Sequence, residues 1–105
     1  MAEGRISLIG FSLEPAEKAI VDNLVRNYKH KIQEKVGYNE IKLHMKKSIH
    51  GKVYLHEVQG TLISDRIFSA KAEDYNLFAA IAEVMEKLMH EAQHNQRKFT
   101  RKDRE

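Results

Sequence analysis

Residues 76–101 read NLFAAIAEVMEKLMHEAQHNQRKFTR and predict one long helix with two unlike sides. At about 100° per residue, one arc is apolar. It is formed by Leu77, Ile81, Val84, Met85, Leu88 and Ala92. The opposite arc holds Lys87, His90, His94, Arg97, Lys98 and Arg101. We expect the apolar arc to pack on a core and the basic arc to face an anionic partner such as phosphate.

The same helix contains the zinc-peptidase pattern His-Glu-Ala-Gln-His, with His90 and His94 one turn apart and Glu91 as the base. Such a site needs a third protein ligand. Extended patterns place glycine and histidine where this chain has Arg97 and Thr100, and only five residues follow Thr100. Neighbouring lysine and arginine side chains would also place positive charge beside the cation. We therefore expect no metal, no cofactor and no catalytic residue.

The chain as a whole predicts one small α+β domain. It has 105 residues, 42% of them hydrophobic and 31% charged, with no cysteine and a net charge of +3. We expect a single domain over residues 1–101 and a basic, frayed tail at 102–105. No apolar run approaches the roughly 20 residues that cross a bilayer, and no secretory signal is visible. The expected location is the cytoplasm.

The remaining segments predict the order β-α-β-β-β-α. A strand is expected at 5–11, a helix from Pro15 to Gly37, and a period-two strand at 41–46. A loop at 48–51 leads to a long strand at 52–63, apolar in both registers, for which we expect a bulge near 57–60. A turn and a strand at 66–72 follow, and Asp74 or Asn76 caps the last helix. Four strands in one sheet, with both helices on one face, satisfy this order.

The first helix also has two sides. Its apolar positions are Ile20, Val21, Leu24, Val25, Tyr28 and Ile32. Arg26, Lys29 and His30 lie on its polar side, so two helices on one sheet face should expose adjacent basic ridges. We expect Tyr54, Phe68 and Phe78 to be mostly buried, which leaves no aromatic platform for stacking bases. Recognition of RNA would then depend on shape and backbone.

Residues 72–81, AEDYNLFAAI, followed by Lys87 and Leu88, carry a resemblance to a known family. In this pattern a strand ends, an acidic or amide cap follows, and the last helix opens with Ala-Ala-Ile. The chain resembles the ribosome hibernation-promoting factors, or ribosome-associated inhibitors, in their short form. Ala82 is a departure, because the family usually has aspartate there.

The resemblance implies a non-enzymatic protein that sits in the decoding channel of the small ribosomal subunit and inhibits by occupancy. Its partner would be structured ribosomal RNA, with no membrane, and the protein would be a monomer off the ribosome. Carried over by position, the contacts come from both helices: Arg26, Lys29, His30, Lys87, His90, His94, Arg97 and Lys98. The alternative is a protein-protein interaction module that uses an open sheet face or edge, with a zinc peptidase a distant third.

Overall fold

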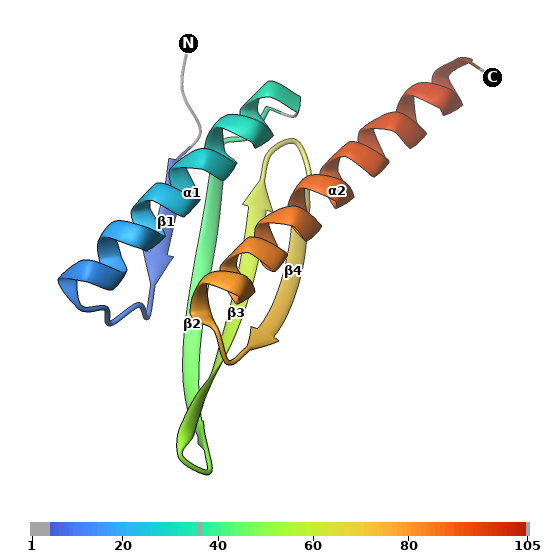
Figure 1. Cartoon of the computed structure of the whole chain (residues 1–105). Coiled ribbons are helices and arrows are strands. Elements are labelled where there is room, and N and C mark those ends of the chain that lie inside the picture. Colours follow the sequence, from blue (N-terminus) through green and yellow to red (C-terminus); the bar gives the residue numbers. More distant parts are fainter. Residues whose placement is uncertain (1–4, 36, 105) are drawn as a thin grey trace.

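The fold is a four-stranded sheet covered on one face by two helices (Figure 1). The computed structural model describes residues 5–35 and 37–104, with side chains as far as His94. The elements are β1 (Arg5–Ile9), α1 (Pro15–Lys35), β2 (Glu40–His50), β3 (Val53–Ile63), β4 (Ile67–Asp74) and α2 (Leu77–Arg104). The predicted α+β class and the order β-α-β-β-β-α are confirmed.

The strands lie in the order β1-β2-β3-β4, with β1 parallel to β2 and the other neighbours antiparallel. The bulge predicted near residues 57–60 is wrong, because every residue of β3 pairs with β2 in one unbroken register. Val58, Gly60 and Leu62 face the helices, while Leu55 and Ile63 are half-buried on the other face. Apolar residues on both faces therefore explain the pattern without an inserted residue.

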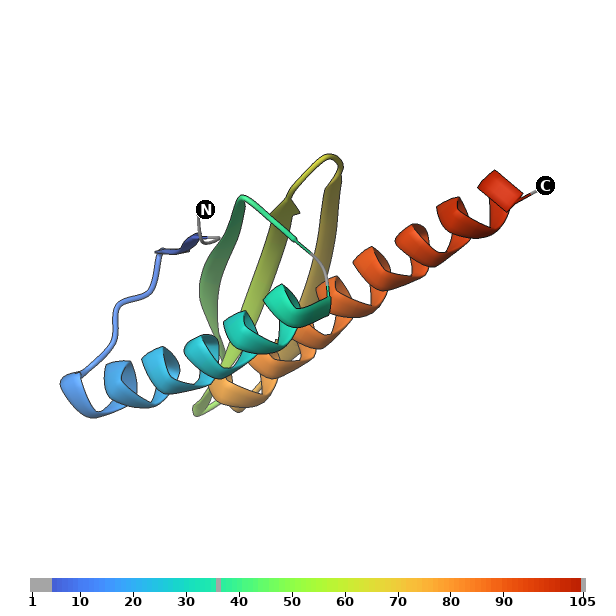
Figure 2. The same ribbon diagram turned by 90° about the horizontal axis from the view of Figure 1, so that it is seen from above.

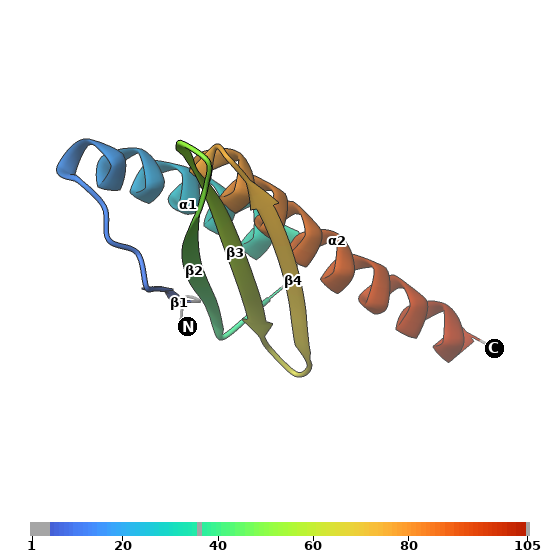
Figure 3. The same ribbon diagram turned by 90° about the horizontal axis from the view of Figure 1, so that it is seen from below.

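Both helices pack on the same face, which leaves the other face of the sheet open (Figures 2 and 3). The predicted apolar arc of α2 is buried in full: Leu77, Ile81, Val84, Met85, Leu88 and Ala92. In α1, Val21, Val25 and Ile32 are buried, and Leu24 and Tyr28 pack against the core. Ile20 is exposed, contrary to prediction, because it lies about 100° around the helix from the buried Val21, at the margin of the apolar arc.

Two glycines allow close approaches that set the position of the elements. A Cβ added to Gly60 would lie 2.6 Å from Cγ1 of Val84 and 2.9 Å from Cδ1 of Leu88, so the missing side chain lets α2 approach β3. Gly10 has a φ of 79°, and an added Cβ would lie 2.8 Å from the carbonyl oxygen of Met45. The missing side chain of Gly10 therefore lets the chain after β1 pass close to the backbone of β2.

The hairpin of β2 and β3 extends past β4 and both helices (Figure 1). The loop predicted at residues 48–51 is wrong, since Ser48, Ile49 and His50 pair with β3 and remain in the strand. The turn consists of two residues, Gly51 and Lys52, and the φ of 67° at Gly51 is typical of a type II′ turn.

The start of α2 is capped by Asn76. Its Oδ1 accepts hydrogen bonds from the backbone N–H groups of Phe78 (2.9 Å) and Ala79 (3.1 Å). Asp74 stabilises the turn before the helix, because its Oδ1 accepts a hydrogen bond from the backbone N–H of Asn76 at 2.8 Å. Of the two predicted caps, Asn76 is therefore the residue that satisfies the free N–H groups of the first turn.

Candidate nucleic-acid interface

A polar contact joins the two helices where they lie side by side. The hydroxyl of Tyr28 in α1 donates a hydrogen bond to Oε2 of Glu86 in α2 at 2.9 Å. Nζ of Lys31 lies 5.2 Å from the centre of the Tyr28 ring. Burial, and after it the hydrogen bond to the Glu86 carboxylate, raises the pKa of Tyr28. We call this contact region, formed by the Tyr28 ring, the Glu86 carboxylate and Lys31, the seam between the helices.

The basic residues predicted on α1 lie away from this seam. Arg26 and His30 are exposed, and each is about 160° around the helix from Tyr28. Lys29, which is half-buried, lies about 100° from Tyr28 on the same flank. Since Tyr28 faces α2, the basic flank of α1 faces away from α2. The two predicted ridges therefore do not share one groove between the helices.

On α2 the three predicted residues with described side chains differ in their contacts. Nζ of Lys87 donates to the backbone carbonyl of Lys71 in β4 at 2.9 Å and lies 3.1 Å from Oε2 of Glu83. Nε2 of His90 lies 3.9 Å from Oε1 of Glu86. His94 is exposed. Lys87 therefore leans over the β4 edge, while both histidines face solvent.

Three further predicted residues, Arg97, Lys98 and Arg101, lie on α2, but their side chains are outside the described residues. The preceding stretch, residues 83–94, carries Glu83, Glu86 and Glu91 against a single lysine. Carboxylates repel phosphate, so this part of α2 is not a uniformly basic surface. The predicted basic character of α2 depends mainly on its last turns.

The His-Glu-Ala-Gln-His pattern lies on the solvent side of α2, where His90, Glu91 and His94 are exposed. In the described part of the chain, no group of three or more His, Cys, Asp or Glu residues is placed to hold a metal ion. None of the described helices is long and apolar enough to cross a membrane.

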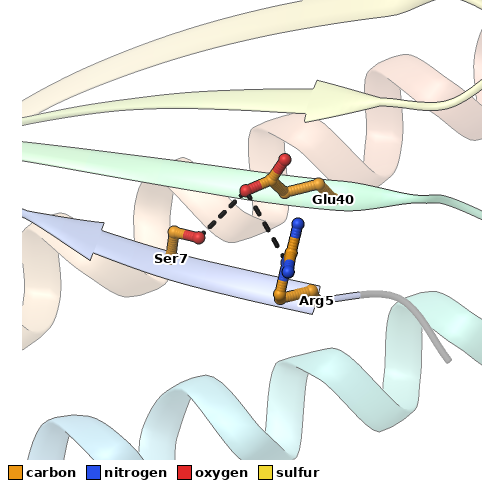
Figure 4. Close-up of polar contacts among 3 residues, drawn as sticks. All are labelled: Arg5, Ser7 and Glu40. Carbon is orange, nitrogen blue, oxygen red and sulfur yellow. Dashed lines mark hydrogen bonds and ion pairs between the residues drawn. The ribbon is translucent and has the colours of Figure 1, made fainter.

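The open face of the sheet carries charged residues at regular spacing. At its β1 edge, Oε2 of Glu40 accepts a hydrogen bond from Oγ of Ser7 at 2.9 Å and lies 4.0 Å from Nε of Arg5 (Figure 4). Lys42, His44 and Lys46 follow on the same face of β2, and all are exposed. Near β4, Nζ of Lys71 lies 2.9 Å from Oε2 of Glu57.

Tyr54 corrects the predicted burial of the aromatic residues. Its side chain is 51% exposed, because the hairpin has passed the ends of β4 and α2 at this position. Phe68 and Phe78 are half-buried. Nζ of Lys47 lies over the Tyr54 ring, 4.9 Å from its centre. An aromatic surface next to a positive charge is therefore present.

The sequence also indicates a positively charged β2–β3 hairpin, which the prediction based on the two helices did not include. Residues 41–56 contain four lysines, three histidines and no aspartate or glutamate. A stretch of this kind, folded into a projecting hairpin, concentrates positive charge more strongly than the described part of α2.

Comparison with known proteins shows the fold. No protein-family model matches the chain, and no curated protein matches it. A ribosomal subunit interface protein from Coxiella burnetii is 16% identical, with 88% of this chain and 97% of that chain covered and a TM-score of 0.65. The N-terminal domain of Protein Y from Thermus thermophilus is 18% identical, with 90% and 98% covered and a TM-score of 0.54. The chain shares the fold of these two proteins along nearly its whole length.

Proposed function

We propose that this chain is a short ribosome hibernation factor, a non-enzymatic cytoplasmic protein that binds the small ribosomal subunit and inhibits translation by occupying the decoding channel. The observation that carries the proposal is the shared fold with a protein named for the ribosomal subunit interface. The motif at residues 72–81, followed by Lys87 and Leu88, supports the same family from the sequence.

The arrangement of the helices supports binding to RNA phosphates. Arg26 and His30 extend from the outer flank of α1, and His90 and His94 extend from the outer face of α2. Each phosphate that a cationic side chain on these helices neutralises releases counterions, and the exposed histidines can donate hydrogen bonds to phosphate oxygens. Affinity should therefore fall steeply with salt.

Cosedimentation with purified small ribosomal subunits at low and moderate salt tests the proposal. We expect the protein in the pellet at low salt and a smaller fraction at moderate salt. Arg26→Glu is the sharpest helix variant, because Arg26 is exposed and lies away from both the core and α2. Lys87 is less suitable, since its ammonium group also contacts Lys71 and Glu83.

Lys18→Glu is the matched control, because it makes the same charge change on an exposed position near the start of α1. We expect Arg26→Glu to weaken binding several-fold more than Lys18→Glu. Protein that stays in the supernatant at both salt concentrations would rule the proposal out. Self-association without affinity for RNA would instead favour an interaction module.

A further inference from the structure

The end of the β2–β3 hairpin is a free two-stranded ribbon, which we call the hairpin finger and define as residues 47–56. Pairing between β1 and β2 ends at Ile9 and His44. Pairing between β3 and β4 begins at His56 and Asp74. Apart from His56, which pairs with Asp74 and lies 3.1 Å through Nδ1 from the carbonyl oxygen of Tyr75, the strands of the finger pair only with each other. The finger projects from the rest of the fold (Figure 1).

The finger exposes apolar groups that the fold does not use. Ile49, Val53 and Tyr54 are exposed by 68%, 52% and 51%. Ile49 and Tyr54 are direct cross-strand partners, so their side chains lie together on the face that continues from the helix-covered side of the sheet. An isolated two-stranded hairpin is only marginally stable in water. Neighbouring exposed apolar residues such as Ile49 and Tyr54 on such an element can mark a contact site for a partner.

The charge of the finger identifies the class of partner. Lys47 and Lys52 lie on the finger, Lys46 directly precedes it, and the finger contains no acidic residue. The nearest acid along β3 is Glu57, which lies opposite Lys46 and contacts Lys71. Because phosphate groups are the anions that this charge would attract, a nucleic acid fits the finger better than an average protein surface does.

Tyr54 shows how the nucleic acid would be held. Lys47 places its ammonium group 4.9 Å from the ring centre, a cation–π contact with an exposed aromatic face. A nucleobase could take the place of the ammonium group on the ring, and the released Lys47 would pair with a neighbouring phosphate. Stacking on an aromatic side chain is worth roughly 1–3 kcal/mol per base and tolerates any base.

We propose that the hairpin finger is a second RNA-binding site, in which an unpaired base stacks on Tyr54 and Lys47 and Lys52 contact the flanking phosphates. The site is separate from the helix faces, and its assignment to ribosomal RNA rests on the proposed function. It also adds recognition of single-stranded RNA to a fold whose helices suit structured RNA.

A single-stranded oligoribonucleotide of about 12 nucleotides with one 2-aminopurine base is the probe. Stacking on Tyr54 should quench the 2-aminopurine fluorescence when the full chain binds. Tyr54→Ala should abolish the quench and weaken binding about tenfold, and Tyr54→Phe should retain both. Lys52→Gln should reduce the salt slope by about 0.7. Tyr75→Ala, which removes another exposed tyrosine outside the finger, is the matched control and should behave as the wild type.

Wild-type affinity and quench in Tyr54→Ala would overturn the inference, as would the absence of any quench in the wild type. Parallel cosedimentation with small subunits separates this result from the proposed function. If the wild type cosediments and Tyr54→Ala behaves identically in both assays, the RNA site on the finger is ruled out and the proposed function is not affected. If the oligonucleotide is quenched but no protein cosediments, the RNA site is supported and the ribosomal function is ruled out. A cosedimentation defect in Tyr54→Ala without any quench in the wild type assigns the finger to a protein contact and overturns the RNA site.

Discussion

Tyr28 and Glu86, 58 residues apart in the chain, connect the two helices through a hydrogen bond of 2.9 Å. The ring of Tyr28 also packs against the core. The phenol points toward α2, so Arg26 and His30, about 160° around α1 from Tyr28, face outward.

Tyr28→Phe should reduce the free energy of unfolding by about 1 kcal/mol, since the ring is kept and only the hydrogen bond is lost. Urea unfolding monitored by circular dichroism measures this difference. Tyr75→Phe is the control, because Tyr75 is 58% exposed. Equal stability of the two variants would show that the hydrogen bond makes no net contribution.

Tyr28 should lose its proton at a higher pH in the folded protein than in the unfolded protein. Burial is the larger cause of its raised pKa and the Glu86 hydrogen bond the next, so the ordinary value of 10.0 is exceeded. Because the pKa of Tyr28 is higher in the folded than in the unfolded protein, its contribution to stability is fully present below the unfolded pKa. This contribution is lost as the pH rises through the folded pKa. NMR titration of the Tyr28 ring should give a midpoint above 10.0. Glu86→Gln should lower that midpoint only in part, because burial remains; an unchanged midpoint would contradict the role of Glu86.

Gly60 should be intolerant of a side chain. In Gly60→Ala the new methyl group meets Cγ1 of Val84 at 2.6 Å and Cδ1 of Leu88 at 2.9 Å, so we expect a loss of about 1–3 kcal/mol. Gly37→Ala is the control, since an added Cβ there meets no atom within 4 Å. The double variant Gly60→Ala, Val84→Ala should be more stable than the sum of the single effects predicts. Strict additivity in thermal unfolding would argue against this contact.

The elements that could be predicted from the sequence are those whose pattern is local. The apolar arc of α2 repeats with the helical period, so its burial from Leu77 to Ala92 follows from the sequence itself. The exposure of Tyr54 could not be predicted, because it depends on where β4 ends and where α2 begins. The outward position of Arg26 depends on the rotation of α1 on the sheet and against α2, which involves contacts between residues far apart in the chain. Local periodicity therefore predicts the core better than it predicts the surface.

The Lys71 and Glu57 pair should make stability depend on pH. The hydrogen bond from Lys71 lowers the pKa of Glu57 below its ordinary value of 4.5, and Glu73 lies directly opposite Glu57. A lowered folded pKa contributes stability above the unfolded pKa, and this contribution is lost as the pH falls through the folded pKa. Lys71→Gln should thus lower the melting temperature at neutral pH but have little effect at a pH well below the folded pKa of Glu57, where its carboxyl group is protonated. Glu73→Gln should not destabilise the protein, since like charges opposite each other are unfavourable. An equal loss in Lys71→Gln at both pH values would exclude the electrostatic explanation.

Glu83 should weaken the binding of RNA to α2. Its carboxylate lies 3.1 Å from Nζ of Lys87, so it both repels phosphate and occupies the lysine that would bind it. Glu83→Gln should therefore tighten binding to small subunits and steepen its salt dependence by about one unit, as expected for one additional phosphate contact. Glu14→Gln makes the same charge change just before α1 and should have a smaller effect. Salt titrations of both variants measure the difference. If Glu83→Gln and Glu14→Gln change the slope equally, net charge alone explains the effect, and α2 does not face the RNA at this position.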